Sequence, residues 1–236
     1  MSQAGVIDNY SCYVRNANTV NTETSLYLEE GSGRQDLERY ISNKYLQVHG
    51  AHINEYLPIL AGVQAGGELA GAFGLRPGQY RPMFLEQYLD APIEQQVASI
   101  TKQPVDRCAL MEIGNLAITR TGYGPLVMVL LSMSLAEAGY EWMVFTVTEQ
   151  VERLMKCLGF EPHYLVSADP DRLDGDQLLW GSYYQNNPRV MVGSLKTVSE
   201  IIARDSRLSN IAVQQRENIA DIASSLRDYR RLGEID

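Results

Sequence analysis

The clearest chemical signal is a strand that runs into a glycine turn and then into a helix. Arg120, Gly122, Tyr123 and Gly124 follow an apolar stretch, and a helical pattern opens at Pro125. Glycines allow close backbone approach, and the first amides of a helix are unsatisfied donors that suit a pyrophosphate or a phosphopantetheine phosphate. A tight strand-to-helix connection explains the same glycines. We therefore predict that these four residues after the strand bind a cofactor, with the plain connection as the alternative.

A carboxylate on the preceding strand is the first candidate for acid–base chemistry. The strand predicted over 105–119 places Glu112 on one face with Leu110, Gly114 and Leu116. Burial raises the pKa of a carboxyl group and makes it a better base, whereas a neighbouring arginine lowers that pKa. The role of Glu112 is thus either that of a base or an internal ion pair with Arg76 or Arg107.

Two further acidic residues, Glu86 and Asp90, are four positions apart in a helical pattern over 83–100 that Pro92 must begin or break. On one helical face they could bind a cationic or amino substrate, although a solvated face has the same spacing. Asn115 is either a substrate anchor or the polar residue of a bulge at Gly114. The strand predicted over 141–147 adds substrate-binding candidates at Phe145 and Thr146.

Neither the cysteines nor the histidines indicate a metal site. Cys12, Cys108 and Cys157 lack metal-type spacing, and His49 and His52 have no further ligands nearby in the sequence. We therefore expect no metal, and we expect Cys157 to be a small buried residue.

The charge balance limits the classes of partner. The net charge of −9 and the pI near 4.9 disfavour general binding to nucleic acid. The first residues lack the features of a signal peptide, and the most apolar run, 125–135, is shorter than the ~20 residues of a spanning helix. These features predict a cytoplasmic protein without a membrane span.

Periodicity and turn signals predict an α/β fold with helices on both faces of a mixed sheet. Strands are expected at 10–14, 25–29, 56–63, 68–75, 105–119, 141–147, 163–167, 178–184 and 189–195, and helices from 34, over 83–100, 125–138 and 148–158, and twice after 196. We divide the chain into an N-terminal arm (1–24), a main domain (25–195) and C-terminal amphipathic helices (196–236), which either cap the domain or form a homodimer.

The order of strand, R-x-G-x-G turn, helix, strand and a helix ending in Leu158-Gly159-Phe160 resembles the acyl-CoA-binding core of the GNAT superfamily. Over most of 34–195 the chain more closely resembles the thermostable hemolysin family, which is similar in fold to acyl-homoserine-lactone synthases. The stretches that carry this resemblance are Phe84-Leu85-Glu86-Gln87-Tyr88-Leu89-Asp90, Glu112-Ile113-Gly114-Asn115-Leu116-Ala117 and Trp180-Gly181-Ser182-Tyr183-Tyr184.

This resemblance implies a GNAT-like, mostly antiparallel sheet in which two strands splay apart at the site. It assigns pantetheine binding to the backbone of Leu116, Ala117 and Ile118, and protonation of the leaving thiolate to Tyr183 or Tyr184. It also makes Glu112 the amine-handling carboxylate and supports Glu86 as a second catalytic residue. Arg76 corresponds to a substrate-binding position of the synthases, although the chain lacks their full pattern.

The resulting functional expectation is an N-acyltransferase that moves an acyl group from coenzyme A or an acyl carrier protein to the amine of a small molecule. An aminoacyl-tRNA-dependent transferase and a non-catalytic acyl-ligand-binding or membrane-active effector are the alternatives.

Overall fold

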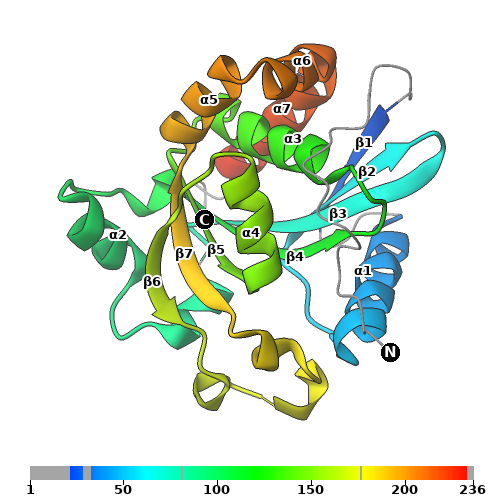
Figure 1. Ribbon diagram of the computed structural model, residues 1–236. Coiled ribbons are helices and arrows are strands. Elements are labelled where there is room, and N and C mark those ends of the chain that lie inside the picture. Colours follow the sequence, from blue (N-terminus) through cyan, green and yellow to red (C-terminus); the bar gives the residue numbers. More distant parts are fainter. Residues whose placement is uncertain (1–21, 29–32, 81, 176, 233–236) are drawn as a thin grey trace.

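The structure, a computed structural model, describes residues 22–28, 33–80, 82–175 and 177–232. Its centre is a seven-stranded sheet in the order β1-β2-β3-β4-β5-β7-β6 (Figure 1). Every neighbouring pair is antiparallel except β4 and β5, which are parallel. The fold is therefore a mixed α/β fold with a mostly antiparallel sheet, as predicted. The strands are β1 (Thr22–Tyr27), β2 (Ile59–Ala65), β3 (Glu68–Pro77), β4 (Leu110–Ile118), β5 (Trp142–Val147), β6 (His163–Ser167) and β7 (Arg189–Ser194).

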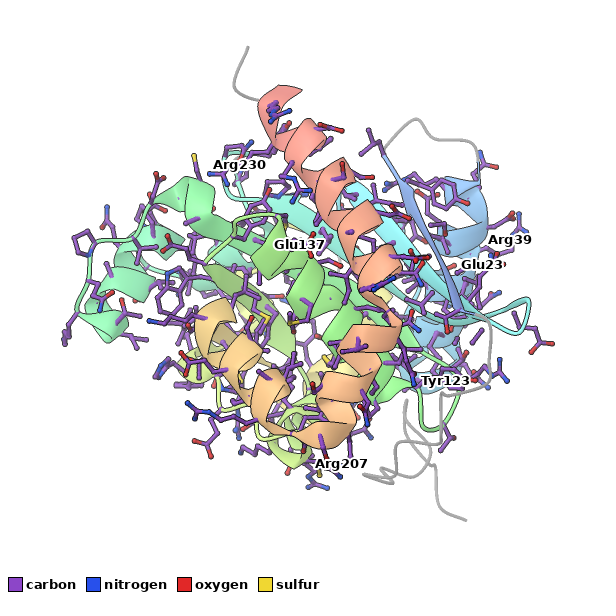
Figure 2. The ribbon with its side chains drawn as sticks, turned by 90° about the horizontal axis from the view of Figure 1, so that it is seen from above. Glu23, Arg39, Tyr123, Glu137, Arg207 and Arg230 are labelled. Atoms are coloured by element: carbon purple, nitrogen blue, oxygen red, sulfur yellow. The ribbon has the colours of Figure 1, made fainter. Side chains whose placement is uncertain are left out.

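One face of the sheet is covered by an almost wholly apolar helix. This helix, α3 (Gly124–Glu137), is buried along most of its length, because the sheet lies on one side and the C-terminal helices pack on the other. Those helices are α5 (Leu195–Arg204), α6 (Ser206–Gln214) and α7 (Arg216–Leu232). Figure 2 shows α7 lying across α3, with Tyr123 and Glu137 at the two ends of α3. The helix α4 (Glu149–Cys157) lies on this face as well.

The opposite face carries α1 (Arg34–His49) and α2 (Ile93–Thr101), which lie at opposite ends of the sheet in Figure 1. Leu37 and Ile41 of α1 pack on Leu60 and Ala72 of the sheet. Beside them lie two 3₁₀ segments, Phe84–Tyr88 and a strap that we define as 177–186, with turns at Gln177–Trp180 and Tyr183–Asn186. These segments form the wall of the site described below.

Three sequence predictions are wrong in their local structure. Pro92 begins α2 as predicted, but the residues before it form a 3₁₀ segment and Leu89 is extended, so Glu86 and Asp90 do not share the predicted helical face. Residues 178–184 form 3₁₀ turns instead of a strand. The predicted pair of helices after 196 is a set of three, since Asp205 caps α6 by accepting from the amides of Arg207 and Leu208.

The remaining differences are smaller. Cys157 is exposed, so its expected burial is wrong. The strand predicted at 10–14 lies outside the described residues, as do parts of the predicted arm and of the C-terminal segment, and the domain boundaries stay predictions. Among the described residues, no helix is long and apolar enough to cross a membrane.

A β-bulge in β4 changes which side chains share a face. Ala72 pairs with Ala117 and Gly74 with Gly114, so two residues of β4 oppose the single residue Phe73. Asn115 takes the left-handed conformation (φ 50°), as a bulge residue can. A bulge was expected near Gly114. Its effect is to turn Leu116 to the α3 face of the sheet, so the prediction that Leu116 shares a face with Glu112 is wrong.

Candidate active site

The site begins where β4 and β5 stop pairing. The last paired residues are Ile113 and Phe145, although β4 continues to Ile118 and β5 to Val147. The bulge at Asn115 turns β4 away just beyond this point. The two central strands therefore splay apart, as the family resemblance implies, and open a hole through the sheet.

An apolar cavity of about 70 Å³ fills this hole, and we call it the inner cavity. On the α3 side it is lined by Met128, Leu131, Met143, Met155 and Phe160. Side chains of this kind bind an apolar group by burying its surface.

A larger cavity of about 540 Å³, the outer cleft, lies on the α1 side of the sheet. Its charged and polar lining includes Glu55, Arg76, Glu86, Glu112 and Asp174. The residues that line both cavities are Tyr45, Ile113, Gly114, Asn115, Thr146 and Tyr183. The two spaces thus meet at the splay, with a polar space on the α1 side and an apolar space on the α3 side.

Glu112 lies on β4 at the floor of the outer cleft, and its side chain is 3% exposed. Its carboxylate accepts hydrogen bonds from the amides of Leu85 (2.8 Å) and Phe84 (3.0 Å), and Nε of Arg76 lies 3.9 Å away. Burial raises the pKa of Glu112 to about 7, although Arg76 and the two amides act in the opposite direction. A carboxyl group with this pKa can take a proton from an amine near neutral pH.

Glu86 lines the cleft as well, but its carboxylate is held by Arg107. The guanidinium of Arg107 reaches both oxygens of Glu86 (2.5 and 2.7 Å), Glu94 (2.7 Å) and the carbonyl of Gly78 (2.6 Å). Burial alone would raise the pKa of Glu86, but the hydrogen bonds from Arg107 and from backbone amides lower it to about 2. Glu86 is therefore ionised and engaged in an ion-pair network at neutral pH.

Asn115 fixes the loop that forms one side of the cleft. Its Oδ1 accepts from the amide of Leu57 (2.9 Å), and its Nδ2 donates to the carbonyl of Glu55 (3.3 Å). The side chain of this bulge residue therefore has its own polar groups paired, and it holds the backbone of Glu55 and Leu57 at the side of the cleft.

The structure separates the two neighbouring tyrosines. Tyr183 lines both cavities, and burial raises its pKa well above the usual value, so its phenol stays protonated. Tyr184 lines neither cavity, and its hydroxyl forms a 2.6 Å hydrogen bond with that of Tyr88. Of the two candidates, Tyr183 alone is at the junction.

The glycine turn lies at the start of α3 and lines neither cavity. Gly122 has a φ of 88°, which favours glycine, and a Cβ on Gly124 would come within 3.0 Å of Leu154. Arg120 donates to the carbonyl of Ala65 (2.5 Å) and stacks over Tyr123. These contacts give the turn a packing role, and its predicted role in binding a cofactor stays a prediction.

The other predicted residues divide clearly. Leu116 and Phe145 line the inner cavity, Arg76 lines the outer cleft, and Thr146 lines both. Three residues are outside both spaces: Ala117 and Ile118, which are buried in the sheet, and Asp90, whose side chain is 88% exposed and paired with Arg172.

Sequence reasoning missed part of the aromatic wall. Tyr45 and His49, one helical turn apart on α1, line the inner cavity, and Trp180 of the strap lines the outer cleft. The i, i+4 spacing of Tyr45 and His49 could have indicated a shared face, but it could not show that this face meets the strap. The described part of the chain holds no group of three or more His, Cys, Asp or Glu side chains suited to a metal ion.

A family model described as thermostable hemolysin matches residues 27–199. No curated protein sequence matches the chain significantly.

Several solved structures share its fold at low sequence identity. The acyl-homoserine lactone synthase LasI is 10% identical, with 75% of this chain and 91% of that chain covered and a TM-score of 0.51. FeeM, an N-acyl amino acid synthase from uncultured soil microbes, is 12% identical, with 81% and 98% covered and a TM-score of 0.51. The CoA-dependent acyl-homoserine lactone synthase BjaI, solved with SAM and isopentyl-CoA, is 11% identical, with 78% and 89% covered and a TM-score of 0.50.

Proposed function

The chain belongs to the thermostable hemolysin family, and we propose that it transfers an acyl group from a pantetheine thioester to the amine of a small-molecule acceptor. The observation that carries this proposal is the pair of joined cavities at the splay of β4 and β5. One is apolar and narrow, the other is wide and polar, and Glu112 lies on the floor of the polar one.

The inner cavity receives the acyl chain in this account. Its methionines, Met128, Met143 and Met155, are flexible apolar side chains that adapt to a chain of methylene groups. Burial of each methylene contributes about 0.8 kcal/mol, so the cavity favours a donor that carries an aliphatic acyl group. The thioester then lies at the junction of the two cavities, beside Thr146 and Tyr183.

The acceptor amine enters from the outer cleft. Its nitrogen attacks the thioester carbon, the new C–N bond forms and the C–S bond breaks, which gives an amide and a thiol. Glu112 takes the proton that the neutral amine nitrogen loses and then releases it to solvent, and the leaving sulfur takes up one proton from solvent. Tyr183, protonated at neutral pH, donates a hydrogen bond to that sulfur.

The electrostatics of the outer cleft agree with an amine acceptor. Apart from Glu86, which is paired with Arg107, its carboxylates Glu55, Glu112 and Asp174 outnumber Arg76, the one arginine of its lining. The resulting negative potential attracts a cationic amine from solution. The cation loses its extra proton to solvent before the attack, and Glu112 takes only the proton that the neutral amine loses as the amide forms. Coenzyme A and a loaded acyl carrier protein present the same pantetheine thioester, and either serves as the donor here.

Native mass spectrometry of the wild type and Glu112→Gln tests the proposal with coenzyme A, decanoyl-CoA and a decanoyl carrier protein. We expect both proteins to retain one loaded donor, and we expect only the wild type to convert it when an amine mixture is added. Failure of the wild type to retain or consume either of the two loaded donors would contradict the proposed function.

A further inference from the structure

His49 is the last residue of α1 and lines the inner cavity. It is 8% exposed, and its Nδ1 is fully buried without a hydrogen-bond partner among the described residues. A buried polar atom without a partner costs about 1–3 kcal/mol, so native proteins rarely keep one without a reason. A ligand in the inner cavity would supply the missing partner.

The strap holds His49 in place from two sides. The carbonyl of His49 accepts from the amide of Ser182 (2.7 Å) and from its hydroxyl (3.2 Å). The imidazole ring lies edge-on to the ring of Tyr183, with centroids 5.2 Å apart, and 6.0 Å from that of Tyr45. Because both aromatic neighbours line the outer cleft as well, His49 lies next to the junction where the thioester is placed.

The imidazole is neutral at physiological pH. Burial lowers the pKa of His49 to about 4, so the ring carries one N–H donor and one bare nitrogen from mildly acidic to basic pH. A neutral imidazole can polarise a carbonyl oxygen by donating its N–H, and this mode avoids the cost of burying a positive charge in an apolar wall.

We propose that His49 donates a hydrogen bond from Nδ1–H to the acyl carbonyl oxygen of the donor and stabilises the negative charge that develops there during attack by the amine. This inference rests on the proposed function. No proton is transferred by His49: the hydrogen bond shortens as the oxygen becomes negative and relaxes when the C–S bond breaks.

Two substitutions separate this role from a packing role. His49→Leu removes the donor and keeps an apolar side chain, whereas His49→Asn places an amide N–H near the position of Nδ1. Loss of one donor to an oxyanion lowers kcat by roughly 10²–10³-fold. We expect that loss in His49→Leu with KM within about threefold, and recovery to within about tenfold of wild type in His49→Asn. His163→Leu, on exposed β6 outside both cavities, is the matched control and should retain wild-type kcat.

Nitrogen chemical shifts of the His49 ring supply a readout that does not depend on turnover. With a non-reactive ketone analogue of decanoyl-CoA bound, in which a CH2 group separates the carbonyl from the sulfur, we expect a proton on Nδ1 and a bare Nε2. A proton on Nε2 alone in that complex would overturn the inference. So would an unchanged kcat in His49→Leu, or an equal loss of kcat and melting temperature in both His49 variants. If the wild type consumes acyl donors while any of these results holds, only the role of His49 fails; if it consumes none, the proposed function fails and this role fails with it.

Discussion

Arg76 and Glu112 are register partners on β3 and β4, and Nε of Arg76 lies 3.9 Å from Oε2 of Glu112. The short contacts of Glu112 go instead to the amides of Phe84 and Leu85, and Arg76 donates to the carbonyl of Pro82 (2.7 Å). The arginine therefore moderates the charge of the carboxylate without fully neutralising it. A carboxyl group that titrates near neutral pH results from this balance of burial and partial pairing.

The pH dependence of transfer should report Glu112. Since a base must be deprotonated, kcat/KM is expected to rise with pH and to level off above about 7, the pKa of Glu112. Glu112→Gln should lose the transfer activity, and with it the rise of kcat/KM with pH. Stability has the opposite sign: the folded state holds the proton more tightly than the unfolded chain, so the free energy of unfolding should fall as pH rises from 4.5 to about 7. Chemical denaturation across that range checks this, and a flat pH–rate profile would exclude Glu112 as the base.

Removal of Arg107 should destabilise the protein strongly. Arg107→Met leaves Glu86 and Glu94 without their buried cation, and loss of one partner of a buried pair costs about 3–5 kcal/mol. The pKa of Glu86 is lowered to about 2, so the stability that this pair contributes is present above 4.5 and is lost as pH falls toward 2. Urea denaturation of Arg107→Met should show that the free energy of unfolding no longer includes the contribution that the wild type loses between pH 4.5 and pH 2. The double variant Arg107→Met with Glu86→Gln should recover part of the loss, and no recovery would contradict the pairing.

The strap depends on Gly181. Its φ is 52°, and a Cβ there would lie 2.1 Å from the carbonyl oxygen of His49. Gly181→Ala should therefore displace the strap, lower kcat by at least about tenfold through Tyr183 and His49, and lower the melting temperature. Gly67→Ala is the matched control, because Gly67 has a positive φ of 80° but open space around its Cβ. If both variants lose activity equally, backbone strain alone explains the effect.

Acyl-chain preference should follow the volume of the inner cavity. Met128→Trp fills part of that cavity, and we expect the ratio of kcat/KM for long over short acyl donors to fall about tenfold or more, by the energy of two buried methylenes. Met133→Trp is the control, because Met133 is on the same helix but lines neither cavity. Competition between acyl donors of different length measures this ratio independently of general destabilisation. An unchanged ratio in Met128→Trp would show that the acyl chain of the donor does not bind in the inner cavity.

Most of the sheet could be predicted from the sequence because its signals are local. Gly66-Gly67 between two apolar runs indicated the β2–β3 hairpin, and the 110–160 segment carried caps and glycine stops for α3 and α4. Glu112 was found for the same reason, as a lone carboxylate in an apolar strand.

The site wall could not be predicted because long-range contacts determine it. The Trp180–Tyr184 stretch has the aromatic composition of a strand, but its conformation is fixed by hydrogen bonds to His49, more than 130 positions earlier. The bulge at Asn115 adds one residue to β4, so Leu116 points to the opposite face of the sheet. A simple alternation of faces along the sequence cannot predict such an extra residue. Glu86 was expected on a regular helix, and its partner Arg107 is 21 positions away.

The central claim is tested most directly by amine-dependent release of free thiol from decanoyl-CoA and from a decanoyl carrier protein, with the amide product identified by mass spectrometry. The wild type should release thiol and form amide in equal amounts with at least one donor and amine, and Glu112→Gln should form neither. Donor that stays intact with every amine, in a protein shown to be folded, would contradict it.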